Sequence, residues 1–237
     1  MPERPFGEII TFYSYKGGTG RSMALANVGY ILATDPSYGG KKVLMIDWDL
    51  EAPGLHRFFY KEFKEALRVR STGSEYRQAL DQKSGLLDFA IEARDFYETS
   101  YSSENLPESH AAIPRAREIF DRIVVKVDFD KLPLKLDGIP NLWLLKAGRQ
   151  DPTSDYGDKV RKFDWENFYR RYGSFFTHFR AYLMRNFDFI LIDSRTGLTD
   201  VGGICTKVMP EKLVAVFVPN SQNLEGLAGC GKRDAAT

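Results

Sequence analysis

The pattern of apolar and polar positions predicts alternating strands and helices at the start of the chain. Residues 8–14 are β-branched and aromatic and run into glycines, which is typical of a strand. Residues 22–33 are apolar on most sides and predict a buried helix. The apolar run 43–46 predicts a second strand that is covered on both faces. A strand, a helix and a strand at this spacing form a βαβ unit with a right-handed crossover.

The second half of the chain predicts more elements of the same kind. Residues 187–193 and 212–219 indicate two further strands, and residues 141–148 indicate a weaker one. Residues 164–186 predict an amphipathic helix, because apolar and aromatic side chains recur at spacings of three and four. We interpret its aromatic stripe as core and not as a base-stacking surface. The fold class predicted is therefore α/β, a doubly wound, mostly parallel sheet flanked by helices.

The chain of 237 residues is expected to form a single domain over residues 1–237. Residues 95–138 fit the pattern less well, because they begin polar and contain prolines. We interpret them as an insertion or an excursion from the sheet, with a helix around 114–127. Residues 227–237 lack the apolar content of a closing element. There we expect either a frayed end or the truncated end of a longer protein.

Composition narrows the class of protein. The chain is 43% hydrophobic and 27% charged, as soluble globular proteins are, and its net charge of +1 supplies no global field toward nucleic acid or membranes. Two cysteines, Cys205 and Cys230, form no disulfide framework and favour a reducing compartment. No window approaches the roughly 20 apolar residues of a membrane span, and no signal peptide is recognisable. We expect a cytoplasmic protein.

A glycine-rich segment, YSYKGGTGRS at residues 13–22, lies between the first strand and the first helix. A helix start has unpaired N–H groups and a positive dipole end, and glycines let the backbone approach phosphate oxygens closely. The segment departs from the pattern G-x-x-x-x-G-K-[ST] at Tyr15 and at Arg21. Arg21 keeps the positive charge and can grip a phosphate in a bidentate way, and the Ser22 hydroxyl can ligate Mg²⁺. The residues predicted to contact nucleotide here are Gly17, Gly18, Thr19, Gly20, Arg21, Ser22 and Met23.

The segment KGGTGRS resembles the deviant Walker A loop, K-G-G-x-G-[KR]-[ST], of the ParA/MinD-type ATPases, which belong to the nitrogenase iron-protein-like P-loop NTPases. That loop needs no glycine at the position of Tyr15, so Arg21 remains the one real departure. The resemblance implies an ATP-dependent homodimer in which Lys16 acts catalytically by reaching the partner's phosphates.

Two further segments are similar to motifs of the same family. MIDWDLEAPGL resembles its switch I, which implies that Asp49 positions the attacking water and that Asp47 holds the magnesium shell. FDFILIDSRTG resembles its Walker B strand and switch II. Asp193 ends that strand at the carboxyl edge of the sheet, where it could bind Mg²⁺. Gly197 would let the backbone approach the γ-phosphate, and Arg195 would pair either with phosphate or with a nearby carboxylate.

A third segment, FVPNSQNLEG, resembles the loop that frames adenine in these ATPases, which implies nucleotide contacts from Pro219, Asn220 and Gln222. No N-K-x-D guanine motif is present, which favours ATP over GTP. The resemblance covers about residues 8–94 and 141–226.

The resemblance implies a Mg²⁺-dependent ATPase that hydrolyses ATP slowly, dimerises on ATP binding and acts on a protein partner or a fused downstream domain. A non-hydrolysing ATP-binding module that recruits a partner is an alternative. A partition-type ATPase with non-specific DNA binding is another, against which the net charge argues mildly. A protein-tyrosine kinase of the related type would need a tyrosine-rich tail, and residues 226–237 contain no tyrosine.

Other chemistry-bearing residues have simpler interpretations. The histidines His56, His110 and His178 are scattered without partners at metal-ligand spacing, so we expect structural or surface roles. Cys205 is interpreted as a small packed residue, and the basic segment 68–77 as a solvated helix end.

Overall fold

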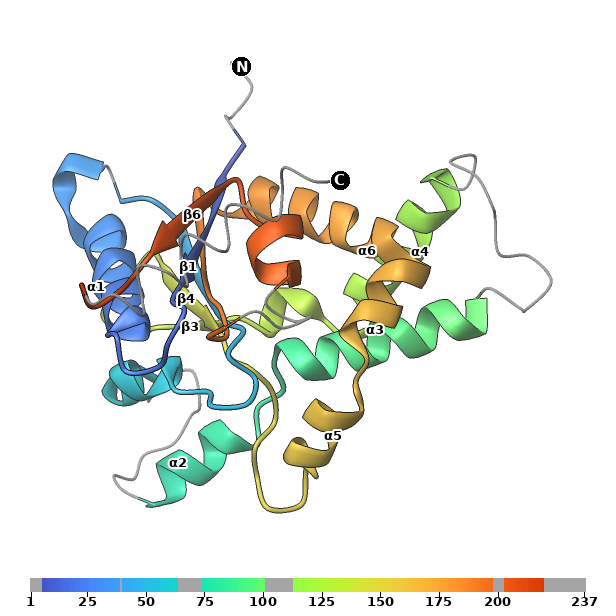
Figure 1. Ribbon diagram of the computed structural model, residues 1–237, viewed down its shortest axis with the longest axis horizontal. Coiled ribbons are helices and arrows are strands. Elements are labelled where there is room, and N and C mark those ends of the chain that lie inside the picture. The colour runs from blue at the N-terminus through green and yellow to red at the C-terminus, as the bar shows by residue number, and fades with distance from the viewer. Residues whose placement is uncertain (1–5, 39, 64–73, 101–112, 198–202, 220–237) are drawn as a thin grey trace.

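A six-stranded sheet runs through the protein in the order β3-β4-β2-β5-β1-β6 (Figure 1). The computed structural model describes residues 6–38, 40–63, 74–100, 113–197 and 203–219. Neighbouring strands are parallel except β3, which pairs antiparallel with β4. The strands are β1 (Glu8–Tyr13), β2 (Val43–Asp47), β3 (Leu134–Lys135), β4 (Leu142–Leu145), β5 (Phe189–Asp193) and β6 (Lys212–Ala215). This arrangement confirms the predicted doubly wound, mostly parallel sheet.

The pairing register brings the ends of three strands together. Phe12 of β1 lies opposite Asp193 of β5, and Asp193 lies opposite Asp47 of β2. The carboxyl ends of β1, β2 and β5 therefore share one edge of the sheet, where open α/β sheets bind ligands. β6 ends at Ala215, earlier than the predicted strand over 212–219, because its partner β1 ends opposite Ala215 at Tyr13.

Helices cover both faces of the sheet (Figure 1). α1 and η2 pack on one face, and α3, α4 and α6 pack on the other. The longer helices are α1 (Arg21–Thr34), α2 (Ser74–Asp81), α3 (Leu86–Ser100), α4 (Ile113–Lys126), α5 (Tyr156–Lys162) and α6 (Trp165–Asn186). The short ones are η1 (Pro36–Tyr38), η2 (Leu55–Phe63), η4 (Phe129–Lys131) and a π-helical turn, η5 (Ile204–Val208).

Close packing of α1 depends on a glycine. Leu25, Ala26 and Gly29 lie on its buried face. A Cβ added to Gly29 would lie 2.9 Å from the sulfur of Met45, which is too short for an undisturbed contact. The missing side chain thus lets α1 approach β2 and places its first residue directly over the sheet edge.

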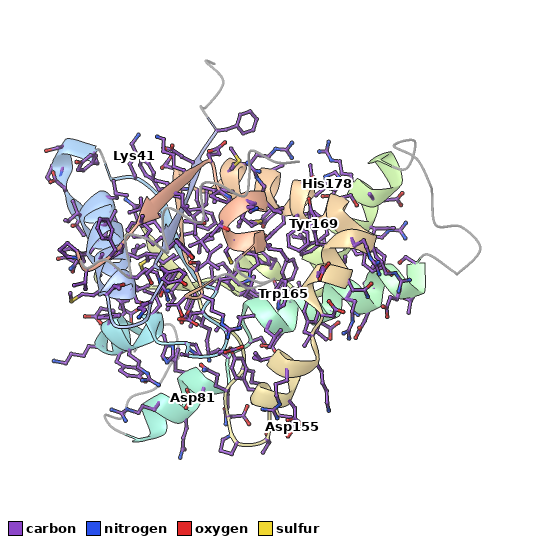
Figure 2. The ribbon with its side chains drawn as sticks, in the orientation of Figure 1. Lys41, Asp81, Asp155, Trp165, Tyr169 and His178 are labelled. Atoms are coloured by element: carbon purple, nitrogen blue, oxygen red, sulfur yellow. The ribbon has the colours of Figure 1, made fainter. Side chains whose placement is uncertain are left out.

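The predicted amphipathic helix over 164–186 is confirmed as α6. Asp164 caps its start by accepting a 2.9 Å hydrogen bond from the N–H of Asn167. The aromatic stripe is buried, and Phe175 and Phe179 stack with ring centroids 5.7 Å apart. Trp165, labelled in Figure 2, is also buried, at 3% exposure. The stripe is core, as predicted.

The segment 95–138 contains the helix predicted around 114–127, which is α4. Phe120 of α4 lies 5.7 Å from Phe175 of α6 between ring centroids, so this part of the segment belongs to the core. Whether the segment is an insertion stays a prediction. Residues 227–237 lie outside the described residues.

Candidate functional site

The loop that follows β1 has the backbone of an anion-binding turn. Gly18 and Gly20 have φ angles of 74° and 85°, a left-handed conformation that glycine adopts readily. A Cβ on Gly18 would meet no atom within 4 Å, so the backbone conformation, and not the space, calls for glycine there. α1 begins directly afterwards at Arg21, and no side chain caps its first N–H groups. These N–H groups can therefore bind an anionic ligand.

A pocket of about 420 Å³ opens over this loop. The predicted site residues that line it are Gly17, Gly18, Thr19, Gly20, Arg21, Ser22, Met23, Asp49 and Arg195. Sequence reasoning missed five lining residues, namely Ser14, Glu51, Ala52, Phe58 and Thr196. Four of the five lie inside the quoted motif segments and Phe58 lies three residues after one, but the motifs assigned none of them a role. Glu51 lies in the turn that follows Asp49, and the turn brings its carboxylate to the same pocket.

Arg21 points its guanidinium at protein carboxylates. Its Nε donates to Asp193 Oδ1 at 2.6 Å, and its Nη2 donates to Asp49 Oδ2 at 2.8 Å. Its Nη1 donates to the Ser14 hydroxyl at 3.2 Å, and its side chain is 6% exposed. Burial lowers the pKa of Arg21, but the two carboxylates outweigh burial and raise it above the ordinary value. An arginine has five N–H donors, so this arrangement leaves two for a phosphate.

Asp193 ends β5 and is 1% exposed. Burial raises its pKa above the ordinary value, while the charge of Arg21 and hydrogen bonds from Ser22 and Arg21 act in the opposite direction. The structure thus brings together Arg21, Ser22 and Asp193, three residues that the sequence assigned to one site. Asp193 itself lies just behind the pocket lining.

Asp47 does not line the pocket. Its side chain is fully buried, and its Oδ2 accepts hydrogen bonds of 3.1 Å from the N–H groups of Gly54 and Leu55. Burial, followed by the charge of Asp193, raises the pKa of Asp47 to about 8. The carboxyl therefore closes the loop 47–55 on itself, an anchoring contact that the sequence did not indicate. A part for Asp47 in a magnesium shell stays a prediction.

Arg195 pairs with a carboxylate, which is one of the two options that the sequence left open. Its Nη1 lies 2.5 Å from Glu51 Oε1. Both side chains are partly exposed at the pocket, at 29% and 51%. Two arginines thus face two carboxylates of one loop, since Arg21 pairs with Asp49 and Arg195 with Glu51.

The remaining predicted residues lie around the pocket or beyond the described chain. Lys16 is partly exposed and does not line the pocket of its own chain. Gly197 has a φ of 78°, and its N–H donates to the Ser14 carbonyl at 3.4 Å. Pro219 is exposed outside the pocket, and Asn220 and Gln222 lie outside the described residues.

Two buried basic residues lie next to the site. His56 is 3% exposed, and its Nδ1 is 4.0 Å from Asp47 Oδ2. Burial, followed by the charge of Lys146, lowers the pKa of His56 to about 4. Lys146 is fully buried, and its Nζ donates to the Leu80 carbonyl at the end of α2 at 2.7 Å.

Cys205 is buried as predicted, and burial raises the pKa of its thiol.

The site fits a phosphate group accompanied by a magnesium ion. The Thr19 hydroxyl is buried and, within the described part of the chain, has no hydrogen-bond partner. Among the described residues no group of three or more His, Cys, Asp and Glu side chains is arranged to hold a metal. Magnesium needs no such cage, because it uses one or two oxygen ligands of the protein together with phosphate oxygens and water. Ser22 and Asp193 supply such oxygens side by side.

No helix in the described part of the chain has both the length and the apolar character needed to cross a membrane.

The doubly wound sheet, with a glycine loop between β1 and α1, has the architecture of solved ParA/MinD-like structures. No protein-family model matches the chain, and no curated protein matches it significantly. Solved structures do match. The septum site-determining protein MinD of Pyrococcus horikoshii, complexed with Mg-ADP, aligns over 97% of this chain with a TM-score of 0.53 and 21% identity.

Two other solved structures share the fold. A plasmid partition protein from Borrelia burgdorferi aligns over 96% of this chain with a TM-score of 0.57 and 18% identity. A variant of McdA from Cyanothece in complex with ATP aligns over 97% with a TM-score of 0.54 and 15% identity. This chain spans 66%, 72% and 63% of the lengths of the MinD, partition and McdA chains. At these identities the likeness establishes the fold.

Proposed function

We propose that this protein is a Mg²⁺-dependent ATP-binding switch of the ParA/MinD type, which dimerises on ATP binding and hydrolyses ATP slowly. One observation carries the proposal. The glycine loop, Arg21 and the carboxylates of Asp49 and Asp193 meet at the carboxyl edge of β1, β2 and β5. That is the chemistry which phosphoryl transfer requires, namely N–H donors for phosphate, a fixed cation, and acidic groups for a metal and a water.

Each residue has a proposed task. The N–H groups of residues 17–20 cradle the phosphates, and Arg21 contributes its two free N–H donors. Ser22 and Asp193 hold the magnesium ion, which when bound neutralises charge on the β- and γ-phosphates. Asp49 positions the attacking water. In the structure Arg21 already pairs with Asp49 and Asp193. When nucleotide binds, the guanidinium must therefore bond to these carboxylates and to the phosphates at the same time.

Lys16 is proposed to act in the partner's site. It does not line the pocket of its own chain, and its position at the start of the loop leaves it partly exposed. A cation at this place can reach the phosphates of a second copy that docks face to face. The alignment with MinD, whose structure contains Mg-ADP, and with McdA in complex with ATP supports nucleotide as the ligand.

A second candidate function is a non-hydrolysing ATP-binding module that recruits a partner. The observation that favours it is the same arginine. In the structure Arg21 bonds both carboxylates that hydrolysis would use. If it kept these bonds with ATP present, the water and the metal would lose their protein ligands.

The deciding experiment measures ATP turnover per molecule in the presence of Mg²⁺ as a function of protein concentration. A specific rate that rises with concentration is expected, because the proposed active unit is a dimer. In parallel, equilibrium binding of a fluorescent ATP analogue measures whether the pocket binds nucleotide. Binding without turnover at any concentration would favour the non-hydrolysing module, and the absence of both would overturn the proposal.

A further inference from the structure

Tyr156, the first residue of α5, reaches the loop that carries the pocket carboxylates. Its hydroxyl donates a 2.7 Å hydrogen bond to the Leu50 carbonyl. Burial, followed by the charges of Asp47 and Asp88, raises the pKa of Tyr156 well above its ordinary value. The phenol therefore remains neutral and keeps its proton for this bond.

The acceptor of this bond stands between the two pocket carboxylates. Leu50 is 2% exposed, whereas its neighbours Asp49 and Glu51 line the pocket and pair with arginines. The carbonyl that Tyr156 binds belongs to the peptide that joins Leu50 to Glu51. A shift of that peptide would move both carboxylates relative to the glycine loop.

The two ends of the same loop are held by other groups. The Trp48 N–H donates to the Asp193 carbonyl at 3.0 Å, and the Asp47 carboxyl holds the N–H groups of Gly54 and Leu55. Tyr156 thus holds the middle of the loop, at Leu50, between these two end contacts.

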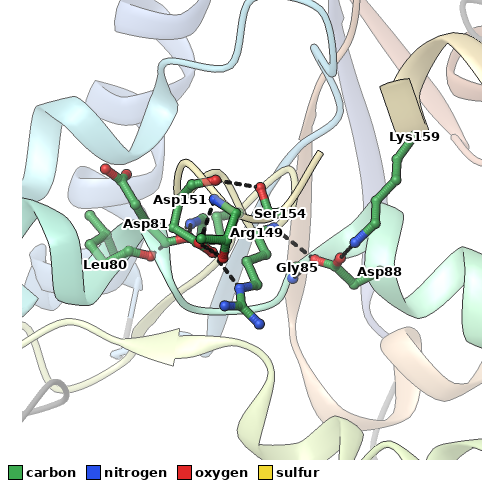
Figure 3. A network of polar contacts seen from close by, with 10 residues as sticks. Leu80, Asp81, Gly85, Asp88, Arg149, Asp151, Ser154 and Lys159 are labelled. Atoms are coloured by element: carbon green, nitrogen blue, oxygen red, sulfur yellow. Dashed lines mark hydrogen bonds and ion pairs between the residues drawn. The ribbon is translucent and has the colours of Figure 1, made fainter. Parts of the chain in front are cut away.

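Lys159 lies on α5, the helix that begins with Tyr156, and belongs to the polar network of Figure 3. Asp88 of α3 accepts hydrogen bonds from the N–H groups of Arg149, at 2.7 Å, and Gly85, at 3.0 Å. Its other oxygen lies 3.5 Å from the Nζ of Lys159 on α5. A Cβ on Gly148 would lie 2.9 Å from the Tyr156 ring, so the glycine lets this ring pack directly on the backbone.

From this geometry we infer that Tyr156 is a positioning residue for Asp49 and Glu51. The inference rests on the proposed function, because it assigns the two carboxylates a task toward bound nucleotide. Tyr156 does not line the pocket. It acts through the Leu50 peptide, and Lys159 of the same helix pairs with Asp88 of α3.

The test compares Tyr156→Phe with Tyr97→Phe. Both changes remove one hydroxyl that donates to a backbone carbonyl, but the Tyr97 hydroxyl bonds Ala116 in the helical layer, away from the pocket. We expect Tyr156→Phe to lower kcat about tenfold and to change KM for Mg-ATP less than about twofold, because the glycine loop still binds the phosphates. Tyr97→Phe should leave both constants unchanged at temperatures where the protein is folded.

A second readout does not depend on activity. Hydrogen exchange of the amides in residues 48–55 should accelerate in Tyr156→Phe and not in Tyr97→Phe, since only the first releases the loop. If the wild-type protein shows no turnover, the hydrolytic function fails, and accelerated exchange would still support the positioning role. Unchanged exchange in this loop, or an equal loss of kcat in both variants, would overturn the inference. If Tyr156→Phe does not fold, Gly148→Ala, which displaces the same ring, takes its place under the same criteria.

Discussion

The Nε of Arg21 lies 2.6 Å from Oδ1 of Asp193, so the first residue of α1 is bonded to the last residue of β5. The same guanidinium also bonds Asp49, which follows β2. One arginine thus joins three elements at the edge of the sheet. Its flat, forked shape suits this task, whereas lysine would place a single point charge there.

Replacing Arg21 should destabilise the protein in the absence of nucleotide. Arg21→Ala leaves the buried Asp193 without its cation, and we expect a loss of about 3 kcal/mol in the free energy of unfolding at pH 7. Urea denaturation measures it, with Arg180→Ala as the control, because Arg180 bonds only the Val208 carbonyl among its described contacts. A loss for Arg21→Ala that is no larger than the loss for Arg180→Ala would contradict the prediction.

Asp49→Asn should strongly reduce turnover and spare ATP binding. The amide keeps the size of the side chain and an oxygen for Arg21, but it cannot accept a proton from water. We expect kcat to fall about 100-fold, while the dissociation constant of Mg-ATP changes only modestly. Asp121→Asn is the matched control, because Asp121 is an exposed carboxylate on α4 that does not line the pocket. Equal losses of kcat in the two variants would show that Asp49 has no special role.

Lys16→Ala should weaken dimerisation and turnover more than ATP binding. The side chain does not line its own pocket, so its removal leaves the phosphate contacts of that chain intact. Sedimentation with ATP and Mg²⁺, together with turnover against concentration, measures the effect. Lys42→Ala, at the start of β2 on the opposite edge of the sheet, is the control. Equal losses of binding and turnover in Lys16→Ala would exclude a role across the dimer.

Gly18→Ala and Gly17→Ala should differ although an added methyl group meets no atom within 4 Å at either position. Gly18 has a φ of 74°, and Gly17 has no φ in the left-handed region. We expect Gly18→Ala to lower the free energy of unfolding by about 1 kcal/mol more than Gly17→Ala, because a side chain strains that conformation. Thermal unfolding without nucleotide tests the difference, and equal melting temperatures would refute it.

His56 should make the protein less stable as the pH falls from about 6.5 to about 4. Its pKa in the folded protein is lowered to about 4 by burial, so the unfolded chain takes up a proton in this range before the folded one does. The full free energy of unfolding is therefore present above the pKa of the unfolded state, about 6.5. It decreases by up to about 1.4 kcal/mol per pH unit as the pH falls toward the pKa of the folded state, about 4. Denaturation curves at several pH values give the free energy of unfolding as a function of pH. His56→Phe should remove the part of this pH dependence that His56 contributes. If the free energy of unfolding changes with pH equally in the wild type and in His56→Phe, His56 does not contribute.

The sequence by itself determined the sheet's central strands, the glycine loop and the long aromatic helix. These features come from local patterns: an apolar run predicts a buried strand, a spacing of three and four predicts a helix, and glycines between the two predict a phosphate loop. The carboxyl ends of β2 and β5 were therefore expected at one edge, and Asp49 and Asp193 do meet Arg21 there.

Only the tertiary structure decided which charges pair and which are buried. Arg21 is 28 residues from Asp49 and 172 residues from Asp193, and Tyr156 is 106 residues from Leu50. Such partners depend on strand register and on how closely helices approach the sheet, which no local pattern contains. Asp47 and Asp49 show this most clearly: two residues apart in sequence, one is fully buried beneath the loop and the other lines the pocket. The backbone turn after β2 separates them, because it bends the chain around the Asp47 carboxyl and leaves Asp49 facing Arg21.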